Sequence, residues 1–210
     1  MQRSRLLLTA VTASMALLGF GASLWWRQAR GPDQPSLETG TLIVPARDLA
    51  PFSLLDLHGA PFTRASLLGH WSLLFFGYTN CPDVCPTTLA TLAALDRELS
   101  RSGAGVRPRV VFVSVDARRD TPAVLARYVP YFDAGFEGVT AATQEQIERF
   151  ARGLGALVII GEDRGGAYSV DHTAALFVIS PQGKLAAILS GPHEVARLRA
   201  DLAKIVEASS

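Results

Sequence analysis

Two uninterrupted apolar runs, joined through a helical pattern, constrain the fold more than any other feature of this sequence. Residues Trp71–Tyr78 (WSLLFFGY) and Arg109–Val115 (RVVFVSV) are almost wholly apolar, as strands covered on both faces are. Between them, residues Thr87–Leu99 repeat apolar side chains at the spacing of an amphipathic helix. Because strands joined through a helix are normally parallel neighbours, these segments predict the centre of an α/β domain.

Weaker patterns predict the rest of the domain. Two hairpins are expected, one formed by Phe52–Leu57 and Ala60–Thr63, the other by Ala174–Ile179 and Lys184–Leu189. Helices are expected from Pro122 until just before Pro130, at Thr143–Leu154 and at Pro192–Val206, with a short strand at Ala156–Ile160. The result is a mixed central sheet with helices on both faces. The thioredoxin-like arrangement is one member of that class, and these patterns alone do not select it.

The amino-terminal segment differs in charge from the rest of the chain. The 210 residues carry 20 Lys and Arg against 19 Asp and Glu, yet residues 1–30 hold four arginines and no acid. Residues 31–210 therefore have 16 bases and 19 acids, a net charge of −3. This charge gives no reason to expect a nucleic-acid partner. Since 49% of the residues are hydrophobic and only 2 are Cys, the composition also excludes a disordered chain and a disulfide-stabilised small protein.

A stretch without charges indicates a membrane anchor within residues 1–30. Residues 6–26 contain no charged side chain, and as a helix they would reach roughly 31 Å, close to the roughly 30 Å hydrocarbon core of a bilayer. Trp25 and Trp26 fall where interfacial aromatic residues lie. We therefore expect a transmembrane helix at about residues 6–26. A cleaved signal peptide is the alternative, because several Thr, Ser and Gly residues dilute the hydrophobicity.

A change of composition separates this anchor from the domain. Residues 31–40 (GPDQPSLETG) contain two prolines and two glycines and predict a linker, so the globular domain is expected at residues 41–210. Two arginines flank each end of the expected transmembrane helix. The distribution of positive charge therefore does not predict its orientation.

The only two cysteines of the sequence, Cys81 and Cys85, lie in GYTNCPDVCPTTL, directly after the first apolar run. A helix beginning at Pro82 would contain Pro86 in its interior, so we expect the helix to begin at Pro86, with Cys85 at its cap and Cys81 on the preceding loop. Both sulfurs would then lie at the positive end of a helix, at the strand edge where α/β sheets bind ligands. This position favours reaction or metal coordination over a structural disulfide, because three intervening residues close too short a loop to stabilise the fold much.

Two thiolates leave a thiophilic metal short of ligands, so a third donor is expected. His172 is the candidate, because it lies in YSVDHT directly before a predicted strand. In a thioredoxin-like sheet this loop faces the dithiol. The other histidines fit exposed or capping positions: His58, His70 and His193. Three nearby acids fit loop and cap chemistry better than contacts to the metal site or a partner, and Tyr78 fits packing; the acids are Asp83, Asp116 and Asp171.

Three segments in this order, GYTNCPDVCPTTL, FVSVDARRDTP and VDHTAALFVISPQGK, resemble the Sco/SenC family of copper-assembly proteins. The resemblance extends over most of residues 48–206 and includes the amino-terminal anchor. It implies a thioredoxin-like fold with an inserted hairpin, and one copper ion, Cu(I) or Cu(II), bound by Cys81, Cys85 and His172. The chemistry agrees, because thiolates prefer soft Cu(I), an imidazole lets the same site hold Cu(II), and zinc would require a fourth ligand.

The resemblance implies a metallochaperone rather than an enzyme, one that delivers copper to the CuA site of cytochrome c oxidase subunit II. One alternative is a thiol–disulfide oxidoreductase in which Cys81 and Cys85 are the redox-active pair and reduce the cysteines of the recipient. Another is a copper or redox sensor. Other copper chaperones are further expected partners. The domain is expected to be monomeric and to face the periplasm from a bacterial inner membrane, since no long transit peptide precedes the anchor.

Overall fold

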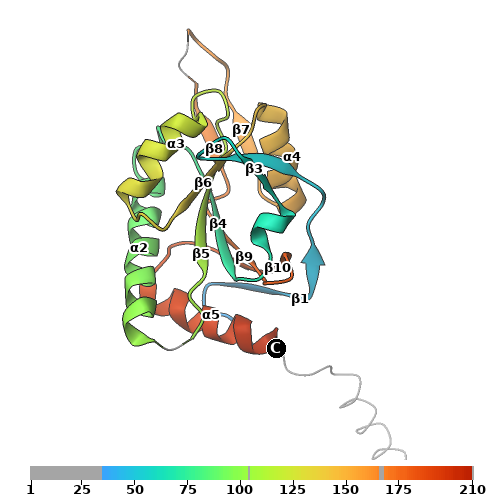
Figure 1. The fold of residues 1–210 in the computed structure, drawn as a ribbon, viewed down its shortest axis with the longest axis vertical. Helices are drawn as coiled ribbons and strands as arrows, with labels where there is room; N and C mark the ends of the chain where they lie inside the picture. The colour runs from blue at the N-terminus through green and yellow to red at the C-terminus, as the bar shows by residue number, and fades with distance from the viewer. Residues whose placement is uncertain (1–34, 104, 166–167, 210) are drawn as a thin grey trace, which may run out of the picture. The chain divides into compact units, whose positions relative to one another are not determined.

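The computed structural model of the protein describes residues 35–103, 105–165 and 168–209 (Figure 1). The expected membrane anchor in residues 1–30 lies outside these ranges. Among the described residues, no helix has the length and hydrophobicity needed to cross a membrane. The described residues form an eight-stranded sheet, a separate two-stranded sheet and the surrounding helices.

The elements carry the labels of Figure 1 and follow one another along the chain. They are β1 (Gly40–Asp48), β2 (Ser53–Asp56), β3 (Pro61–Thr63), the 3₁₀ helix η1 (Arg64–Leu67), β4 (Ser72–Gly77), α2 (Val84–Ser102), β5 (Arg109–Ser114), α3 (Pro122–Tyr128), the 3₁₀ helix η2 (Val129–Tyr131), β6 (Glu137–Thr140), α4 (Gln144–Leu154), β7 (Val158–Ile160), β8 (Val170–His172), β9 (Leu176–Ile179), β10 (Lys184–Leu189) and α5 (Val195–Ala208).

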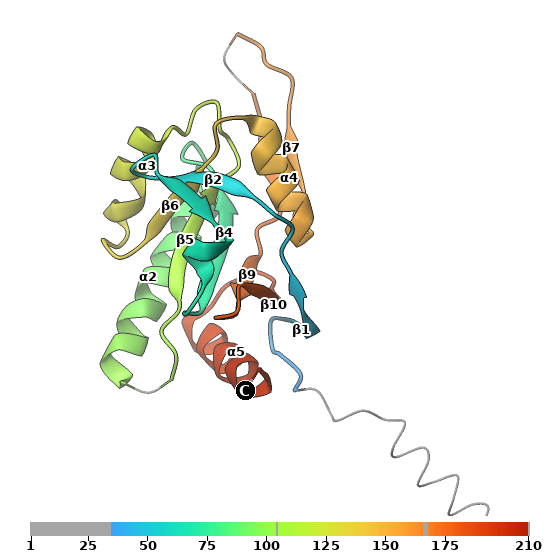
Figure 2. The ribbon, with the colours of Figure 1, turned by 45° about the vertical axis from the view of Figure 1, so that its right-hand side comes forward.

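The main sheet is mixed, as the sequence predicts. Its strand order is β1-β10-β9-β4-β5-β6-β2-β3. Strands β4, β5 and β6 are parallel neighbours at its centre, whereas β9 and β10 form the predicted antiparallel hairpin and β2 and β3 form the other. Strands β7 and β8 pair with each other outside this sheet, beside α4 (Figure 2).

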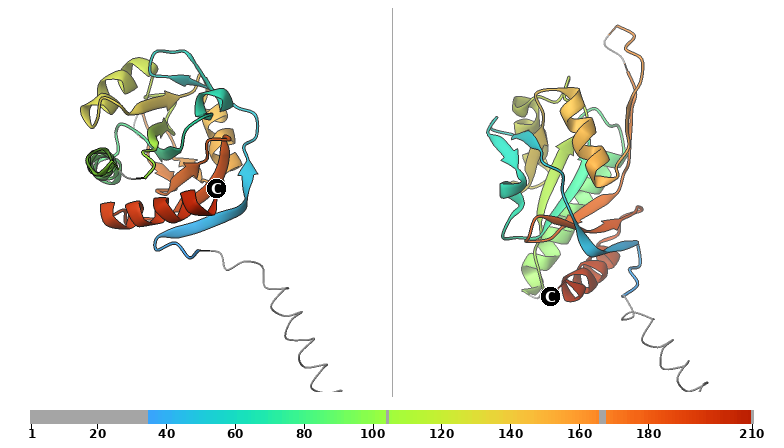
Figure 3. Two further views of the ribbon diagram at one scale, coloured as in Figure 1. Left: turned by 60° about the horizontal axis from the view of Figure 1, so that its bottom comes forward. Right: turned by 90° about the vertical axis from the view of Figure 1, so that its right-hand side faces the viewer.

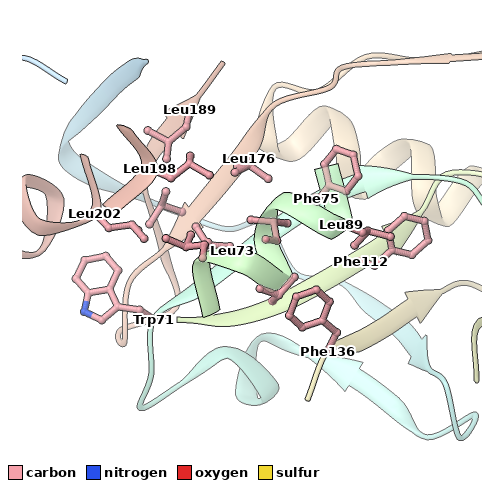
Figure 4. Packing of buried hydrophobic residues seen from close by; sticks show 14 of the residues in the cluster. Trp71, Leu73, Phe75, Leu89, Phe112, Phe136, Leu176, Leu189, Leu198 and Leu202 are labelled. Carbon is pink, nitrogen blue, oxygen red and sulfur yellow. The ribbon is translucent and has the colours of Figure 1, made fainter. Parts of the chain in front are cut away.

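The central strands are buried on both faces because their side chains alternate between two hydrophobic cores. Leu73 and Phe75 of β4 belong to the core that α2, α3 and α5 cover, part of which is drawn in Figure 4. Leu74 and Phe76 point to the other face, which α4 and the β2–β3 hairpin cover. This two-sided burial explains why β4 is a continuous apolar run instead of an alternating one.

The helix that carries Cys85 begins earlier than the sequence analysis predicted. It begins at Val84 with Asp83 as its cap, and not at Pro86. The first helical hydrogen bond runs from the Thr87 N–H to the carbonyl of Asp83, at 3.1 Å. Pro86 is tolerated because it occupies the third helical position, where an N–H has no partner within the helix. Cys85 therefore lies inside the first turn instead of at the cap.

Three strands are missing from the predicted order, and one predicted strand joins a different sheet. Strands β6 and β8 are only four and three residues long, and β1 is a largely exposed edge strand with an irregular register, so none shows a clear hydrophobic period. The predicted strand at Ala156–Ile160 forms β7, but it pairs with β8 and not with the central sheet. The last helix begins at Val195, three residues after its predicted start.

Hydrogen bonds to a buried carboxylate connect the chain just before β1 to helix α5. Asp201 is 0% exposed and accepts hydrogen bonds from the N–H of Glu38 at 2.7 Å, the N–H of Thr39 at 2.9 Å and the hydroxyl of Thr39 at 2.7 Å. Glu38 and Thr39 belong to the segment for which the sequence predicts a linker. Helix α5 consequently lies beside the start of β1 (Figure 3).

Candidate metal centre

The two cysteines lie at the carboxyl end of β4, in different environments. Cys81 is on the loop that follows β4, is partly buried, and donates its backbone N–H to the carbonyl of Tyr78 at 3.2 Å. Cys85 is in the first turn of α2, and its side chain is 0% exposed. Both are free thiols. The chain therefore presents one accessible sulfur and keeps the other inside the protein.

This difference in environment also separates the acidities of the two thiols. Burial alone would raise the pKa of Cys81, but hydrogen bonds from the backbone of Cys85, Asp83 and Val84 lower it overall. Burial is the main reason that the pKa of Cys85 is raised, and its hydrogen bond to Cys81 raises it further. Cys81 is therefore the thiol that ionises first, as expected of a sulfur at the positive end of a helix.

His172 approaches the dithiol, as expected, but from the end of a strand in the two-stranded sheet instead of from the loop that the sequence analysis predicted. It is the last residue of β8, and its Nε2 lies 3.8 Å from the Sγ of Cys85. Its Nδ1 lies 3.2 Å from the carbonyl oxygen of Thr173. Because a carbonyl can only accept, Nδ1 carries the proton, and Nε2 presents its lone pair toward Cys85. This tautomer is the one that a metal ligand needs.

Aromatic side chains hold the imidazole in place. The ring of Tyr78 meets the ring of His172 edge-on, with centroids 5.9 Å apart and an interplanar angle of 88°. Phe75 lies on another side at 6.4 Å and 72°. Burial lowers the pKa of His172, which keeps the ring neutral and able to coordinate. Tyr78, for which the sequence analysis favoured packing, does pack, and the group it packs against is the candidate ligand.

Gly77, the last residue of β4, is a site residue that the sequence analysis did not identify. A Cβ at this position would lie 2.5 Å from Cε2 of Phe112 and 2.9 Å from the Sγ of Cys85. Only glycine leaves room there for the buried sulfur. The signal was present in the sequence, since a glycine ends an otherwise bulky strand four residues before the first cysteine.

The remaining histidines make contacts of other kinds. The backbone N–H of the exposed His58 donates to the carboxylate of Asp56 at 2.8 Å. The Nε2 of His70 lies 2.7 Å from the guanidinium of Arg109. His193 precedes α5 instead of lying in its first turn, and its Nε2 donates to the carbonyl of Ala174 at 3.2 Å.

The three acids divide into two groups. Asp83 caps α2, with its carboxylate 3.4 Å from the hydroxyl of Thr87, and Asp171 is exposed. Asp116 is buried, where it forms an ion pair with Arg119 and accepts a hydrogen bond from the hydroxyl of Tyr168 at 2.6 Å. Loop and cap contacts therefore account for Asp83, while Asp116 belongs to a buried polar cluster.

The candidate ligands are neighbours but not yet a closed coordination site. Within the three described ranges, no three His, Cys, Asp or Glu side chains converge closely enough to surround an ion. Cys85 and His172 are already adjacent, and Cys81 lies on the loop beside them. Two soft sulfurs and one imidazole nitrogen form a donor set that suits a soft metal ion, and the two sulfurs also suit thiol–disulfide exchange.

Comparisons with known proteins identify the relatives of this chain. The SCO1/SenC family model matches residues 43–207. The mitochondrial SCO2 homolog of Mus musculus is 35% identical over 185 residues, which are 86% of this chain and 70% of that protein. The structure of Arabidopsis thaliana ScoI with copper bound aligns with a TM-score of 0.70 at 33% identity, covering 76% of this chain and 98% of that one. Bradyrhizobium japonicum ScoI with copper bound aligns at 0.64 and 32%, covering 74% and 97%.

The fold agrees as well, since the mixed sheet with helices on both faces matches these Sco structures. The family match spans the cysteine loop, the buried acids and the segment of His172. The chain belongs to the SCO1/SenC family.

Proposed function

We propose that this protein is a copper metallochaperone, which holds one copper ion through Cys81, Cys85 and His172 and delivers it to the CuA site of cytochrome c oxidase subunit II. The observation that carries the proposal is the 3.8 Å approach of the His172 Nε2 lone pair to the buried Cys85 sulfur. An exchange reaction between thiols requires no imidazole in this position, whereas a copper site gains from it a third donor that also suits Cu(II).

The identity of the metal follows from the donors and from the relatives. Two thiolates and one imidazole favour Cu(I), and the imidazole extends the site to Cu(II). Structures of the related ScoI proteins from Arabidopsis thaliana and Bradyrhizobium japonicum are described as having copper bound. Zinc fits less well, because it would require a fourth ligand.

Uptake and release follow from the unequal cysteines. Cys81 is partly exposed and ionises first, so it is the first ligand to meet an incoming ion. Its sulfur is hydrogen-bonded to that of Cys85, and Cys85 lies beside His172, so the other two donors are within reach of the same ion. During delivery the thiolates of the recipient displace these ligands one at a time, so that copper is never free in solution. A site with only three ligands favours such an exchange.

A second function is favoured by the same difference between the thiols, namely reduction of the recipient's cysteines. The Cys81 thiolate would attack the recipient's disulfide, forming a mixed disulfide and releasing one recipient thiolate. Cys85 would lose its proton and attack the sulfur of Cys81, forming the Cys81–Cys85 disulfide and releasing the second thiolate. Two electrons pass from this chain to its recipient. A copper or redox sensor remains a third role for the same residues.

The location of the protein is part of this proposal. The stretch of residues 6–26 without charges supports a single membrane anchor, and the reactive dithiol supports a domain that faces the periplasm of a bacterial inner membrane. There the domain could reach subunit II of the oxidase from the same membrane surface. Protease protection in sealed vesicles of known orientation would test this placement.

The test is a titration of the reduced full-length protein, in detergent, with Cu(I) and with Cu(II). We expect one copper per chain, and loss of tight binding in Cys81→Ser and Cys85→Ser. Because loss of a group that merely supports a ligand costs about 10–100-fold in affinity, His172→Ala should cost at least about a hundredfold for Cu(II) while disulfide reduction persists. His70→Ala, a histidine at the opposite end of β4, is the matched control and should bind as the wild type does. A wild-type protein that binds no copper would refute the proposal that it is a copper metallochaperone.

A further inference from the structure

A second buried carboxylate, which the proposed copper ligands do not include, lies beneath the cysteine loop. Asp120 is 1% exposed and immediately precedes the cap of α3. It accepts hydrogen bonds from the N–H of Thr79 at 2.9 Å and the hydroxyl of Thr79 at 2.5 Å, and from the hydroxyl of Ser114 at 2.6 Å. Thr79 lies two residues before Cys81, so Asp120 joins the cysteine loop to the end of β5 and the start of α3.

The donors around Asp120 indicate a negatively charged group. Hydroxyl hydrogen bonds of 2.5 to 2.7 Å are typical of an ionised acceptor, and both hydroxyl contacts of Asp120 fall in that range. Burial raises the pKa of Asp120 overall, and the hydrogen bonds from Ser114 and Thr79 act against this by lowering it. These short bonds are therefore what favours the carboxylate in a buried place.

Among the residues that the structure describes, Asp120 forms no direct ion pair, unlike its neighbour Asp116, although its charge also raises the pKa of Arg119. Asp116 is paired with Arg119, whose guanidinium lies 3.9 Å from the ring centroid of Tyr168. Within the described part of the chain Asp120 forms no ion pair, and its donors are one amide and two hydroxyls. A negative charge without a direct ion pair in a poorly solvated region acts strongly on other charges nearby.

Cys85 is one of the groups that this charge reaches. Ser114, which donates to Asp120, pairs with Gly77 of β4, and a Cβ on Gly77 would lie 2.9 Å from the Sγ of Cys85. The same field acts on any ion bound to this sulfur. Because Cu(II) carries one more positive charge than Cu(I), a negative charge nearby stabilises Cu(II) more.

We propose that Asp120 is a positioning and tuning residue of the copper site, which fixes the cysteine loop through Thr79 and biases the site toward Cu(II) through its charge. This inference rests on the proposed function, since it concerns the copper held by Cys81, Cys85 and His172. It adds a residue that touches no metal but sets which oxidation state the protein prefers to hold. Asp120 would then govern the potential at which the cargo is reduced.

The test compares the affinities of the full-length protein for the two oxidation states, by competition with a Cu(II)-specific and a Cu(I)-specific chelator. In Asp120→Asn the ratio of Cu(II) to Cu(I) affinity should fall about tenfold, which for one electron is a rise in potential of about 59 mV. Ser114→Ala removes one of the hydrogen bonds that favour the carboxylate, so it should shift the ratio in the same direction but by less, about twofold to threefold. This variant preserves the test if Asp120→Asn does not fold.

Asp201 offers a matched control for burial and hydrogen bonding. It is equally buried and also accepts one hydroxyl and two backbone N–H hydrogen bonds, but from the segment before β1. Asp201→Asn should lower the stability and leave the affinity ratio within about twofold of the wild type. If wild-type protein binds copper but the ratio is unchanged in both Asp120→Asn and Ser114→Ala, or rises in either of them, the inference is wrong. If wild-type protein binds no copper, the proposed function fails instead.

Discussion

The two ends of the central strands β4 and β5 differ in whether their titratable side chains are exposed or buried. At the amino end, Arg109 forms an ion pair with Glu137 at 2.7 Å and contacts His70, and all three side chains reach solvent. At the carboxyl end, Cys85 and Asp120 are buried. Burying polar groups lowers the free energy of unfolding unless each group is hydrogen-bonded. The buried polar groups of the reactive site at the carboxyl end therefore lower the stability of the fold.

This difference indicates which end of the sheet carries the functional site. The amino end is held by exposed pairs that contribute little to stability. The carboxyl end is where ligands bind in open α/β sheets, and here it collects the dithiol, the imidazole and the buried acids. Changes at the carboxyl end should therefore have large and specific effects, and changes at the amino end small ones.

The largest expected effect concerns the two cysteines themselves. In the reduced protein, Cys81 should react with iodoacetamide on the order of a hundredfold faster than Cys85, because it is accessible and its pKa is lowered while that of Cys85 is raised. Mass spectrometry of peptides from a time course would measure both rates. Equal rates would show that the carboxyl end does not distinguish its thiols.

The next effect is on packing at the same end. Gly77→Ala should lower the free energy of unfolding by about 1–3 kcal/mol, because the new methyl group has no space between Phe112 and Cys85. It should also weaken copper binding by displacing the sulfur. Denaturant unfolding would measure the loss, and Gly153→Ala is a control, since a Cβ there would come only within 3.9 Å of Ala50. A stable Gly77→Ala protein with unchanged copper affinity would contradict the tight fit.

A smaller effect is expected from pH. Burial lowers the pKa of His193, next to the loop of His172, below its ordinary value of about 6.5. The unfolded chain therefore binds the proton more readily, so the free energy of unfolding should be highest above about pH 6.5 and fall as the pH decreases below that value. His193→Gln should reduce this slope. A free energy of unfolding that rises when the pH is lowered from 7 to 5 would contradict this prediction.

The smallest effect is expected at the amino end. Arg109→Ala should change the free energy of unfolding by less than about 1 kcal/mol, because its ion pair with Glu137 is partly exposed. Copper binding should be unaffected. Thermal unfolding in low and high salt would detect the small contribution, and a loss as large as that of Gly77→Ala would remove the contrast between the two ends.

The sequence was sufficient to predict the centre of this fold, and two of its three candidate ligands, Cys85 and His172, lie 3.8 Å apart in the structure. The apolar runs of β4 and β5 predict a buried parallel pair because their composition requires cover on both faces. The edge strand β1 and the short β8 could not be predicted, since their pairing depends on the strands already assembled beside them. Local sequence patterns determine where long buried elements form, whereas tertiary contacts determine where short ones form.

The sequence predicts which residues form the candidate site, but it does not predict the packing around them. Spacing and resemblance identify Cys81, Cys85 and His172, but the burial of Cys85 depends on the helix beginning at Val84 and on the space left by Gly77. Likewise, the sequence marks only a helix start at Asp120, and its contact with Thr79 joins residues 41 positions apart. Such contacts become visible only when the elements are placed in space.

The central claim is that two sulfurs and one imidazole bind one copper ion, and X-ray absorption of the copper-loaded full-length protein tests it most directly. The account predicts two Cu–S contacts and one Cu–N contact in wild-type protein, and loss of the nitrogen contact in His172→Ala with both sulfurs retained. A spectrum with fewer than two sulfur contacts, or one unchanged in His172→Ala, would contradict it.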